Sequence, residues 1–206
     1  MYALVESGSV TKLFPYPKGF ELNGNQYPQD IFYKWTKDEK EAIGIYEVIT
    51  DSSNKKDEKW YINTNESYTF GNGKVTRSWG TATAKAHADS LYTDQDKTDN
   101  LIPDDKDVGD VKVEGLKTIL IRNIKAQAAN ELQNTDWYII RKADAGTAVP
   151  SSITTHRAAV RTKCAEMETA ITNAADTPAL ETLHTYTEQE DGSITRPLGE
   201  LPTLED

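Results

Sequence analysis

The spacing of hydrophobic and polar positions changes along the chain and divides it into a β-rich part and a helical part. In the first 92 residues, short runs of β-branched and aromatic residues alternate with Gly, Pro and polar clusters, a pattern typical of strands and turns. From Val111 onward, apolar residues recur every three or four positions, which is the period of an amphipathic helix. We therefore predict an α+β fold in which a small β-rich N-terminal domain (1–92) precedes an α-helical hairpin.

Turn residues place the expected strands of the first domain. Ser7-Gly8 separates two apolar runs and predicts an opening hairpin, whereas the Pro and Gly residues between 15 and 28 predict an irregular stretch. Thr36 and Glu39 match a capping box, so a short helix should begin there. A domain of this size can hardly bury all of its aromatic residues. Its core should consist of a few large rings, among them Trp35, Trp60 and Trp79.

Residues 93–110 are crowded with aspartate and have the composition of an acidic linker or a long surface loop. The alternating carboxylates from Asp105 onward resemble the first half of a calcium loop. An EF-hand requires Asp or Asn at the fifth position, Gly at the sixth and Glu at the twelfth, but these positions hold Gly109, Asp110 and Leu116. We expect a solvated linker here, with no metal site.

A helical hairpin is predicted for residues 111–185, followed by an acidic C-terminal tail (186–206). The apolar stripe of the first helix comprises Val113, Leu116, Leu120, Ile124, Ala128 and Leu132. The second helix, from about 152 to 175, carries a heptad pattern that Arg157 interrupts. This seam comprises Ile153, Val160, Cys164, Met167, Ile171 and Ala174. The seam should pack on the first helix, on another copy of the chain in a coiled coil, or on both.

The charge balance and the lack of site motifs narrow the possible functions. With 23 Lys and Arg against 33 Asp and Glu, the net charge is -10, which disfavours phosphate backbones and anionic membrane surfaces as partners. His87, His156 and His184 are widely spaced, and no motif of a hydrolase, a phosphate-binding loop or a zinc site occurs. Cys164 falls on the apolar seam, where a free thiol behaves as a small hydrophobe. We expect no enzymatic activity and no catalytic, cofactor-binding or metal-binding residues.

The N-terminal residues lack the basic and apolar regions of a signal peptide, and the longest apolar runs are far too short to cross a bilayer. We therefore expect no membrane insertion and no export by the usual route.

Two stretches resemble a known group of proteins. Residues 2–10 (YALVESGSV) follow a Y-A-x-V-x-x-G-x-V pattern that is similar to the first hairpin of small tail-associated proteins of tailed phages. A second stretch runs from Thr135-Asp136-Trp137 through Arg141, Gly146 and Pro150 to residues 157–161 (RAAVR). It resembles the T-D-W…R…G…P…Y-R-x-x-L-R signature of phage tail-fibre assembly proteins. His156 stands where that family has Tyr, and Val160 where it has Leu.

The resemblance implies a non-enzymatic virion component of a phage tail that docks to other tail proteins and is assembled in the host cytoplasm. An alternative is a tail-fibre assembly chaperone absent from the mature virion, and a remote one is an envelope-degrading hydrolase. Because tails are rotationally symmetric, a homo-oligomer or a chain bound to a multimeric partner is expected. Trp137 should anchor the crossing between the two helices. The residues expected to make interactions are Trp137, Arg157, Val160, Arg161, Met167 and Ile171.

Overall fold

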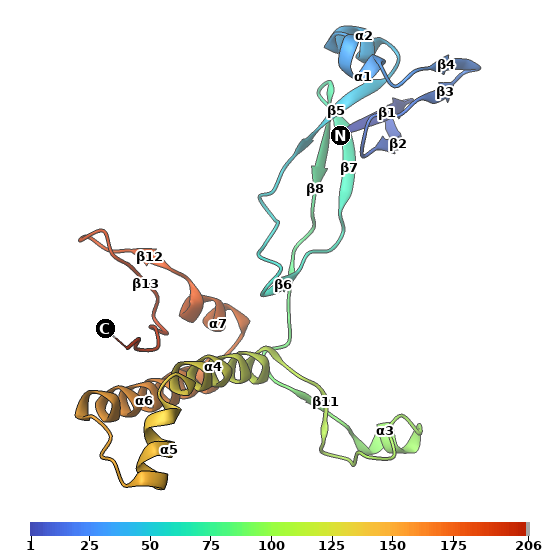
Figure 1. Cartoon of the computed structure of the whole chain (residues 1–206). Coiled ribbons are helices and arrows are strands. Elements are labelled where there is room, and N and C mark those ends of the chain that lie inside the picture. The colour runs from blue at the N-terminus through green and yellow to red at the C-terminus, as the bar shows by residue number, and fades with distance from the viewer. Residues whose placement is uncertain (205–206) are drawn as a thin grey trace. The chain divides into compact units, whose positions relative to one another are not determined.

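The computed structural model describes residues 1–204 and confirms a mixed α+β fold. These residues form seven helices, one curled five-stranded sheet and four two-stranded sheets (Figure 1). The chain separates into two compact units, unit 1 (Met1–Thr83) and unit 2 (Ala84–Asp206). This division comes earlier than the boundary expected after residue 92, because residues 86–90 pair with segments of unit 2.

The large sheet of unit 1 is built from two hairpins joined through a parallel pair of strands. In spatial order its strands are β2 (Ser9–Phe14), β1 (Tyr2–Glu6), β5 (Ile45–Thr50), β8 (Lys74–Ser78) and β7 (Ser67–Gly71). Ser7 and Gly8 have positive φ angles and close the antiparallel β1–β2 pair, so the predicted opening hairpin is confirmed. β5 and β8 are parallel, and the sheet curls until the edge strands β2 and β7 approach each other.

The apolar core of unit 1 lies among β1, β2 and β5, the hairpin of β3 (Phe20–Leu22) with β4 (Asn25–Tyr27), and the short helix α1 (Ile31–Lys34). Its buried members are Leu4, Phe14, Phe20, Ile31, Phe32 and Ile45. The prediction of an irregular stretch at 15–28 is wrong for the β3–β4 hairpin. Phe20 stacks on Tyr27 across this hairpin at 5.2 Å between ring centroids, and burial of the rings offsets the disruptive Gly and Pro residues nearby.

Helix α2 (Lys37–Ala42) begins with the predicted capping box. The Glu39 backbone N–H donates to the Thr36 hydroxyl oxygen at 3.3 Å, and the Thr36 backbone N–H donates to the Glu39 carboxylate at 2.8 Å. These hydrogen bonds lower the pKa of Glu39. Two otherwise unpaired N–H groups at the helix start are thereby satisfied.

The tryptophans of unit 1 are more buried than the sequence suggested. Trp60 and Trp79 lie near β6 (Tyr61–Ile62) and β8 and are at most 7% exposed, and Trp35 is half-buried. Cationic side chains cover the two buried rings, with Arg77 Cζ 4.6 Å from the Trp79 centroid. The short β6 pairs with β9 (Thr83–Ala84).

Unit 2 begins with an arm, residues 88–114, where the sequence suggested a linker followed by a helix. The arm consists of β10 (Ser90–Leu91), α3 (Asp94–Thr98) and β11 (Val111–Val113), with β10 antiparallel to β11. Asp96 caps α3 through Thr93 and accepts a hydrogen bond from Lys112 at 2.5 Å. The aspartates at 93–110 therefore include one with a specific structural role, and pairing with β10 delays the start of the helix expected at Val111.

The base of the arm is fixed to the N-terminus of α4 (Leu116–Gln133). The Asp89 carboxylate accepts from the Gly115 N–H at 2.6 Å and from the Thr118 hydroxyl at 2.8 Å, and Leu116 donates its N–H to the Ala86 carbonyl. A Cβ at position 115 would meet the carbonyl carbon of Ala88 at 2.3 Å, so only glycine fits this approach.

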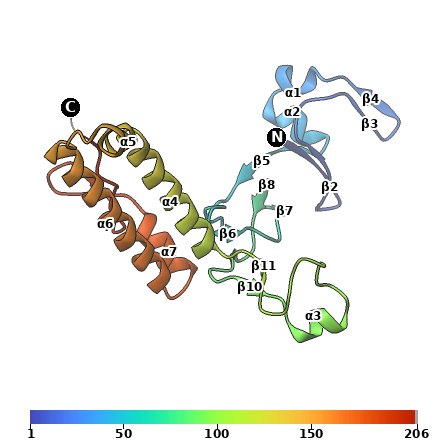
Figure 2. The same cartoon turned by 60° about the horizontal axis from the view of Figure 1, so that its bottom comes forward.

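A helical hairpin forms the body of unit 2. Its helices are α4, α5 (Asp136–Ala145), α6 (Ser151–Asn173) and α7 (Thr177–His184). Helices α4 and α6 run side by side in both views (Figures 1 and 2). All six residues of the predicted seam on α6 are buried within the chain, as are Leu120, Ile124 and Ala128 of α4.

The ends of the later helices differ in part from the prediction. Residues 135–140 were expected to interrupt the helices, but from Asp136 they form α5, which ends at Gly146 in a left-handed conformation (φ 66°). The N-cap of α7 is Asp176 and not Thr177, since the Asp176 carboxylate accepts from the Ala179 N–H at 2.8 Å.

The C-terminal segment is partly structured, in contrast to the expected acidic tail. It contains the hairpin of β12 (Thr187–Glu188) and β13 (Ile194–Thr195). Leu198 is buried, and its backbone N–H donates to the Leu183 carbonyl at 3.0 Å, which fixes the segment to the end of α7.

Candidate docking surface on α5

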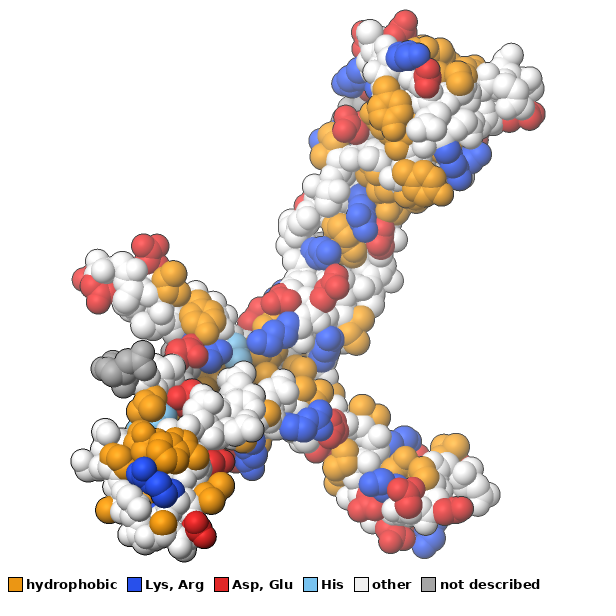
Figure 3. All heavy atoms as spheres, in the orientation of Figure 1, with side chains coloured by type: hydrophobic (Ala, Val, Ile, Leu, Met, Phe, Trp, Pro, Cys, Tyr) orange, Lys and Arg blue, Asp and Glu red, His pale blue; other side chains and the backbone are white. Residues whose placement is uncertain are grey.

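Helix α5 presents large apolar side chains to solvent and buries none of its own residues. Trp137 is 50% exposed and Ile140 is 66% exposed, with Ile139 exposed beside them. Figure 3 shows hydrophobic side chains around a basic one at the end of the hairpin where Figure 1 places α5. Trp137 therefore does not anchor the crossing of the two long helices, because it points away from their seam. We call the side chains of residues 137–141 the α5 surface.

A cation–aromatic stack holds the largest side chains of the α5 surface together. Arg141 Cζ lies 4.5 Å from the ring centroid of Trp137 and 5.4 Å from that of Tyr138, and the two rings are 4.0 Å apart. Arg141 Nε is buried and makes no hydrogen bond within residues 1–204. The guanidinium is therefore held chiefly by the rings, an interaction that gains strength when water is excluded.

Arg157 of α6 fixes the direction in which α5 leaves α4. Its Nη1 donates to the Leu132 carbonyl at 2.8 Å and to the Thr135 hydroxyl at 2.6 Å, and it lies 2.8 Å from an Asp136 carboxylate oxygen. Arg157 is 7% exposed and Thr135 is 1% exposed, so the joint is shielded from water. The residue that interrupts the heptad seam thus joins the end of α4 to the start of α5. The α5 surface is consequently held on a defined support.

The structure places the other expected interaction residues in two different environments. Val160, Met167 and Ile171 are at most 1% exposed and pack inside the hairpin, where no external partner reaches them. Arg161 is exposed on α6, and its Nη1 lies 3.4 Å from the Arg157 carbonyl. Only Trp137 among the six belongs to the α5 surface.

The groups with potential chemistry in unit 2 are engaged in packing. His156 is buried, with its Nε2 3.1 Å from a Glu131 carboxylate oxygen. Burial, followed by a hydrogen bond to Glu168, raises the pKa of the Cys164 thiol, which favours the protonated, unreactive form. No group of three or more His, Cys, Asp or Glu side chains in residues 1–204 is arranged to hold a metal ion.

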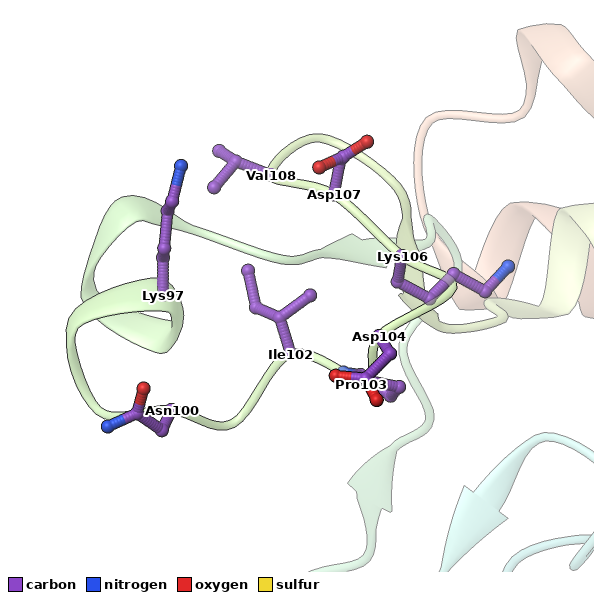
Figure 4. Close-up of a pocket in the computed structure, with 8 residues that line it drawn as sticks. All are labelled: Lys97, Asn100, Ile102, Pro103, Asp104, Lys106, Asp107 and Val108. Carbon is purple, nitrogen blue, oxygen red and sulfur yellow. The ribbon is translucent and has the colours of Figure 1, made fainter.

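A hollow of about 340 Å³ lies on the arm between α3 and the turn that precedes β11. In Figure 4 the side chains of Ile102 and Val108 face this hollow, Asp107 stands beside Val108 at its rim, and Lys106 points away. The hollow thus combines an apolar floor with an acidic edge. Within the described residues 1–204, no helix has the length and apolar character needed to cross a membrane.

Sequence reasoning missed Ile139 and Ile140 as surface residues. The run Trp137 to Ile140 was assigned to a helix crossing because apolar residues usually indicate burial. One signal could have corrected this: Asp136 at the start and Gly146 at the end are helix boundary residues, and a helix between them is apolar over its first turn without a repeating buried face.

Comparisons of the chain with protein-family models, curated proteins and solved structures found no match.

Proposed function

We propose that this protein is a non-enzymatic structural component of a phage tail that assembles with itself and with other tail proteins. The observation that carries the proposal is the α5 surface, an exposed Trp-Tyr-Arg stack on a helix whose direction is fixed by buried hydrogen bonds. Trp, Tyr and Arg are the residues that contribute most binding energy at protein interfaces. The resemblance of residues 135–161 to tail-fibre assembly proteins supplies the phage context.

Unit 1 suits the role of a docking domain for other tail proteins. Its aromatic core is satisfied internally, so that it is expected to fold without a partner. Two tyrosines, Tyr16 and Tyr33, are each about two-thirds exposed (65% and 67%) and can contact a neighbour without loss of the core. A rigid domain with a few exposed aromatic anchors loses little conformational entropy on binding.

The proposal is tested on purified virions of the phage that carries this sequence. Quantitative mass spectrometry should find the chain at a fixed copy number per tail. A chain that is required for assembled tails but absent from them is instead an assembly chaperone. A chain with neither property, whose deletion leaves tails intact, overturns the tail assignment.

A matched pair of variants connects the virion measurement to the α5 surface. Trp137→Ala should reduce the copy number in particles, because it removes the largest exposed ring of the stack. Ile62→Ser, at a half-exposed position of unit 1 away from the two tyrosines, is the control and should be incorporated normally. Equal incorporation of both variants would remove the α5 surface from the proposal.

A further inference from the structure

The arm of unit 2 exposes apolar side chains that it cannot bury by itself. Residues 88–114 contain five exposed aliphatic residues, Leu91, Leu101, Val108, Val111 and Val113. The arm is a two-stranded ribbon with one short helix, and such a ribbon is marginally stable alone in water. Its order depends on polar contacts, chiefly Asp96 with Thr93 and Lys112. An exposed aliphatic surface of this kind is typical of a segment that docks on a partner.

The charge of the arm identifies the kind of partner that fits. Residues 88–114 contain nine Asp and Glu against three Lys, and Figure 3 shows acidic side chains gathered over the end of the arm that holds α3. The hollow between Ile102 and Val108 therefore presents an apolar floor inside an acidic surface. Its complement is a large apolar side chain flanked by cations.

The α5 surface has this composition. Trp137 is half exposed, Arg141 stacks on it, and Lys142 follows in the next position of the same helix. No carboxylate of the described residues 1–204 is recorded as an ion-pair partner of Arg141 or Lys142, so both cations can face the acidic rim of a bound arm. Apolar contact and opposite charge thus favour the same pairing.

The arm and the α5 surface of one chain are kept apart by α4. This helix has 18 residues and therefore a length of about 27 Å, with the arm at its N-terminus and α5 at its C-terminus. The contacts of Asp89 with Gly115 and Thr118 fix the base of the arm at the far end from α5. The pairing is therefore expected between two copies.

We propose that the arm of one copy docks on the α5 surface of a second copy, with Trp137 entering the hollow between Ile102 and Val108. Arg141 and Lys142 then face Asp107 and the neighbouring aspartates of the arm. The contact is heterologous, since two different surfaces meet, and it generates a ring if the rotation closes. This inference rests on the proposed function insofar as it names the partner of the α5 surface.

The test is the mass of the purified full-length chain measured by light scattering over a concentration series. The wild-type chain should associate beyond a dimer, and added salt should weaken the association because opposite charges contribute to it. Trp137→Ala and Val108→Glu should each raise the dissociation constant at least about tenfold, as expected for residues at the centre of an interface. Ile49→Ser, at an exposed position of unit 1, should leave it unchanged.

A mixing experiment distinguishes this contact from a symmetric one. Trp137→Ala chains keep an intact arm, and Val108→Glu chains keep an intact α5 surface. Their mixture should form heterodimers and nothing larger, whereas each variant alone stays monomeric. A wild-type chain that is monomeric up to its solubility limit, or a mixture that does not form heterodimers, overturns the proposal. So does association that survives both substitutions, which would place the contact elsewhere.

The outcome is separable from that of the virion measurement. A monomeric chain that is nevertheless found in particles overturns the arm contact and leaves the tail function in place. A chain that associates through both surfaces but is absent from tails and dispensable for them does the reverse. Circular dichroism on each variant verifies that the helices are retained, since both substituted side chains are solvent-exposed.

Discussion

Unit 1 and unit 2 differ in charge and in where their aromatic residues lie. Residues 1–83 contain ten Lys and Arg against eleven Asp and Glu, whereas residues 84–206 contain thirteen against twenty-two. Unit 1 encloses Phe14, Phe20 and Phe32 in one cluster, but unit 2 leaves its single tryptophan half exposed. Almost the whole net charge of the chain therefore lies in the unit that exposes apolar segments.

This difference has a physical meaning for assembly. Exposed apolar ribbons and helices associate with many surfaces unless charge restricts their partners, and a high density of like charge opposes such non-specific association. In unit 2 the excess of carboxylates repels other acidic surfaces, so that only a basic apolar patch remains attractive. Unit 1 needs no such device, because its large rings are already buried.

The largest expected effect separates the stability of the two units. Met167→Ala removes a side chain that is 1% exposed in the α4–α6 seam and should lower the free energy of unfolding of unit 2 by about 2–5 kcal/mol. Helical circular dichroism measures unit 2. In a Trp137→Phe background, tryptophan fluorescence measures unit 1 alone, because the other three tryptophans lie there.

The matched variant in unit 1 is Ile45→Ala, whose side chain is also 1% exposed. It should shift the fluorescence transition by a similar amount and leave the helical transition in place. If either substitution shifts both transitions equally, the two units unfold together, and the comparison between them loses its energetic basis.

The sequence predicted the elements whose pattern is local and repeated. The seam of α6, the Ser7-Gly8 turn and the Thr36 capping box depend on periodicity or on a few neighbouring residues, and the structure contains all of them. The β3–β4 hairpin was missed because its stability comes from Phe20 packing on residues distant in sequence, which no local rule records.

The candidate site was predicted only in part, and the reason lies in Trp137 and Arg157. Sequence rules treat a tryptophan as a core residue and an arginine in a seam as a defect. The structure reverses both roles, since Arg157 is buried where it satisfies the end of α4, and Trp137 is exposed. Such a reversal cannot be deduced from composition, because it depends on which backbone carbonyl lies within reach of the guanidinium.

The second prediction concerns the close approach at the base of the arm. Gly115→Ala places a methyl group 2.3 Å from the Ala88 carbonyl carbon and should destabilise unit 2 by about 1–3 kcal/mol as the arm base separates from α4. Gly71→Ala in unit 1 is the control, because nothing lies within 4 Å of its added methyl group. Chemical denaturation followed by circular dichroism measures both. Equal effects would mean that strand propensity, and not the close approach, determines the cost.

The third prediction uses the pH dependence of the arm. Hydrogen bonds from Lys112 and Thr93 lower the pKa of Asp96 to about 2, below the usual 3.8. A lowered pKa stabilises the arm above the unfolded value, and this stabilisation is lost as pH falls from about 4 toward 2. Exchange of the Tyr92 and Gly109 amides, which bond across the arm, should therefore accelerate in that window.

Asp96→Asn supplies the control for this pH dependence. The variant should exchange faster than the wild type at pH 6 and at the same rate near pH 2, where the wild-type carboxyl is increasingly protonated. Asp94→Asn, one turn position away and exposed, should behave like the wild type throughout. Wild-type exchange that follows only the intrinsic chemical dependence on pH would show that Asp96 does not hold the arm.

The smallest expected effect compares the two capping boxes of the molecule. Thr36→Ala removes the cap of α2, a six-residue helix with no buried residue, and should cost about 0.5–1 kcal/mol in unit 1. Thr93→Ala removes the same pair of hydrogen bonds from α3, but there the released carboxylate of Asp96 also binds Lys112. The change in unit 2 should therefore extend along the arm and accelerate exchange at Tyr92 and Gly109. Fluorescence-detected denaturation in the Trp137→Phe background measures the first effect, and amide exchange measures the second. Exchange confined to α3 in the Thr93→Ala variant would contradict this difference, because it would mean that the Asp96–Lys112 contact holds the arm without help from the cap.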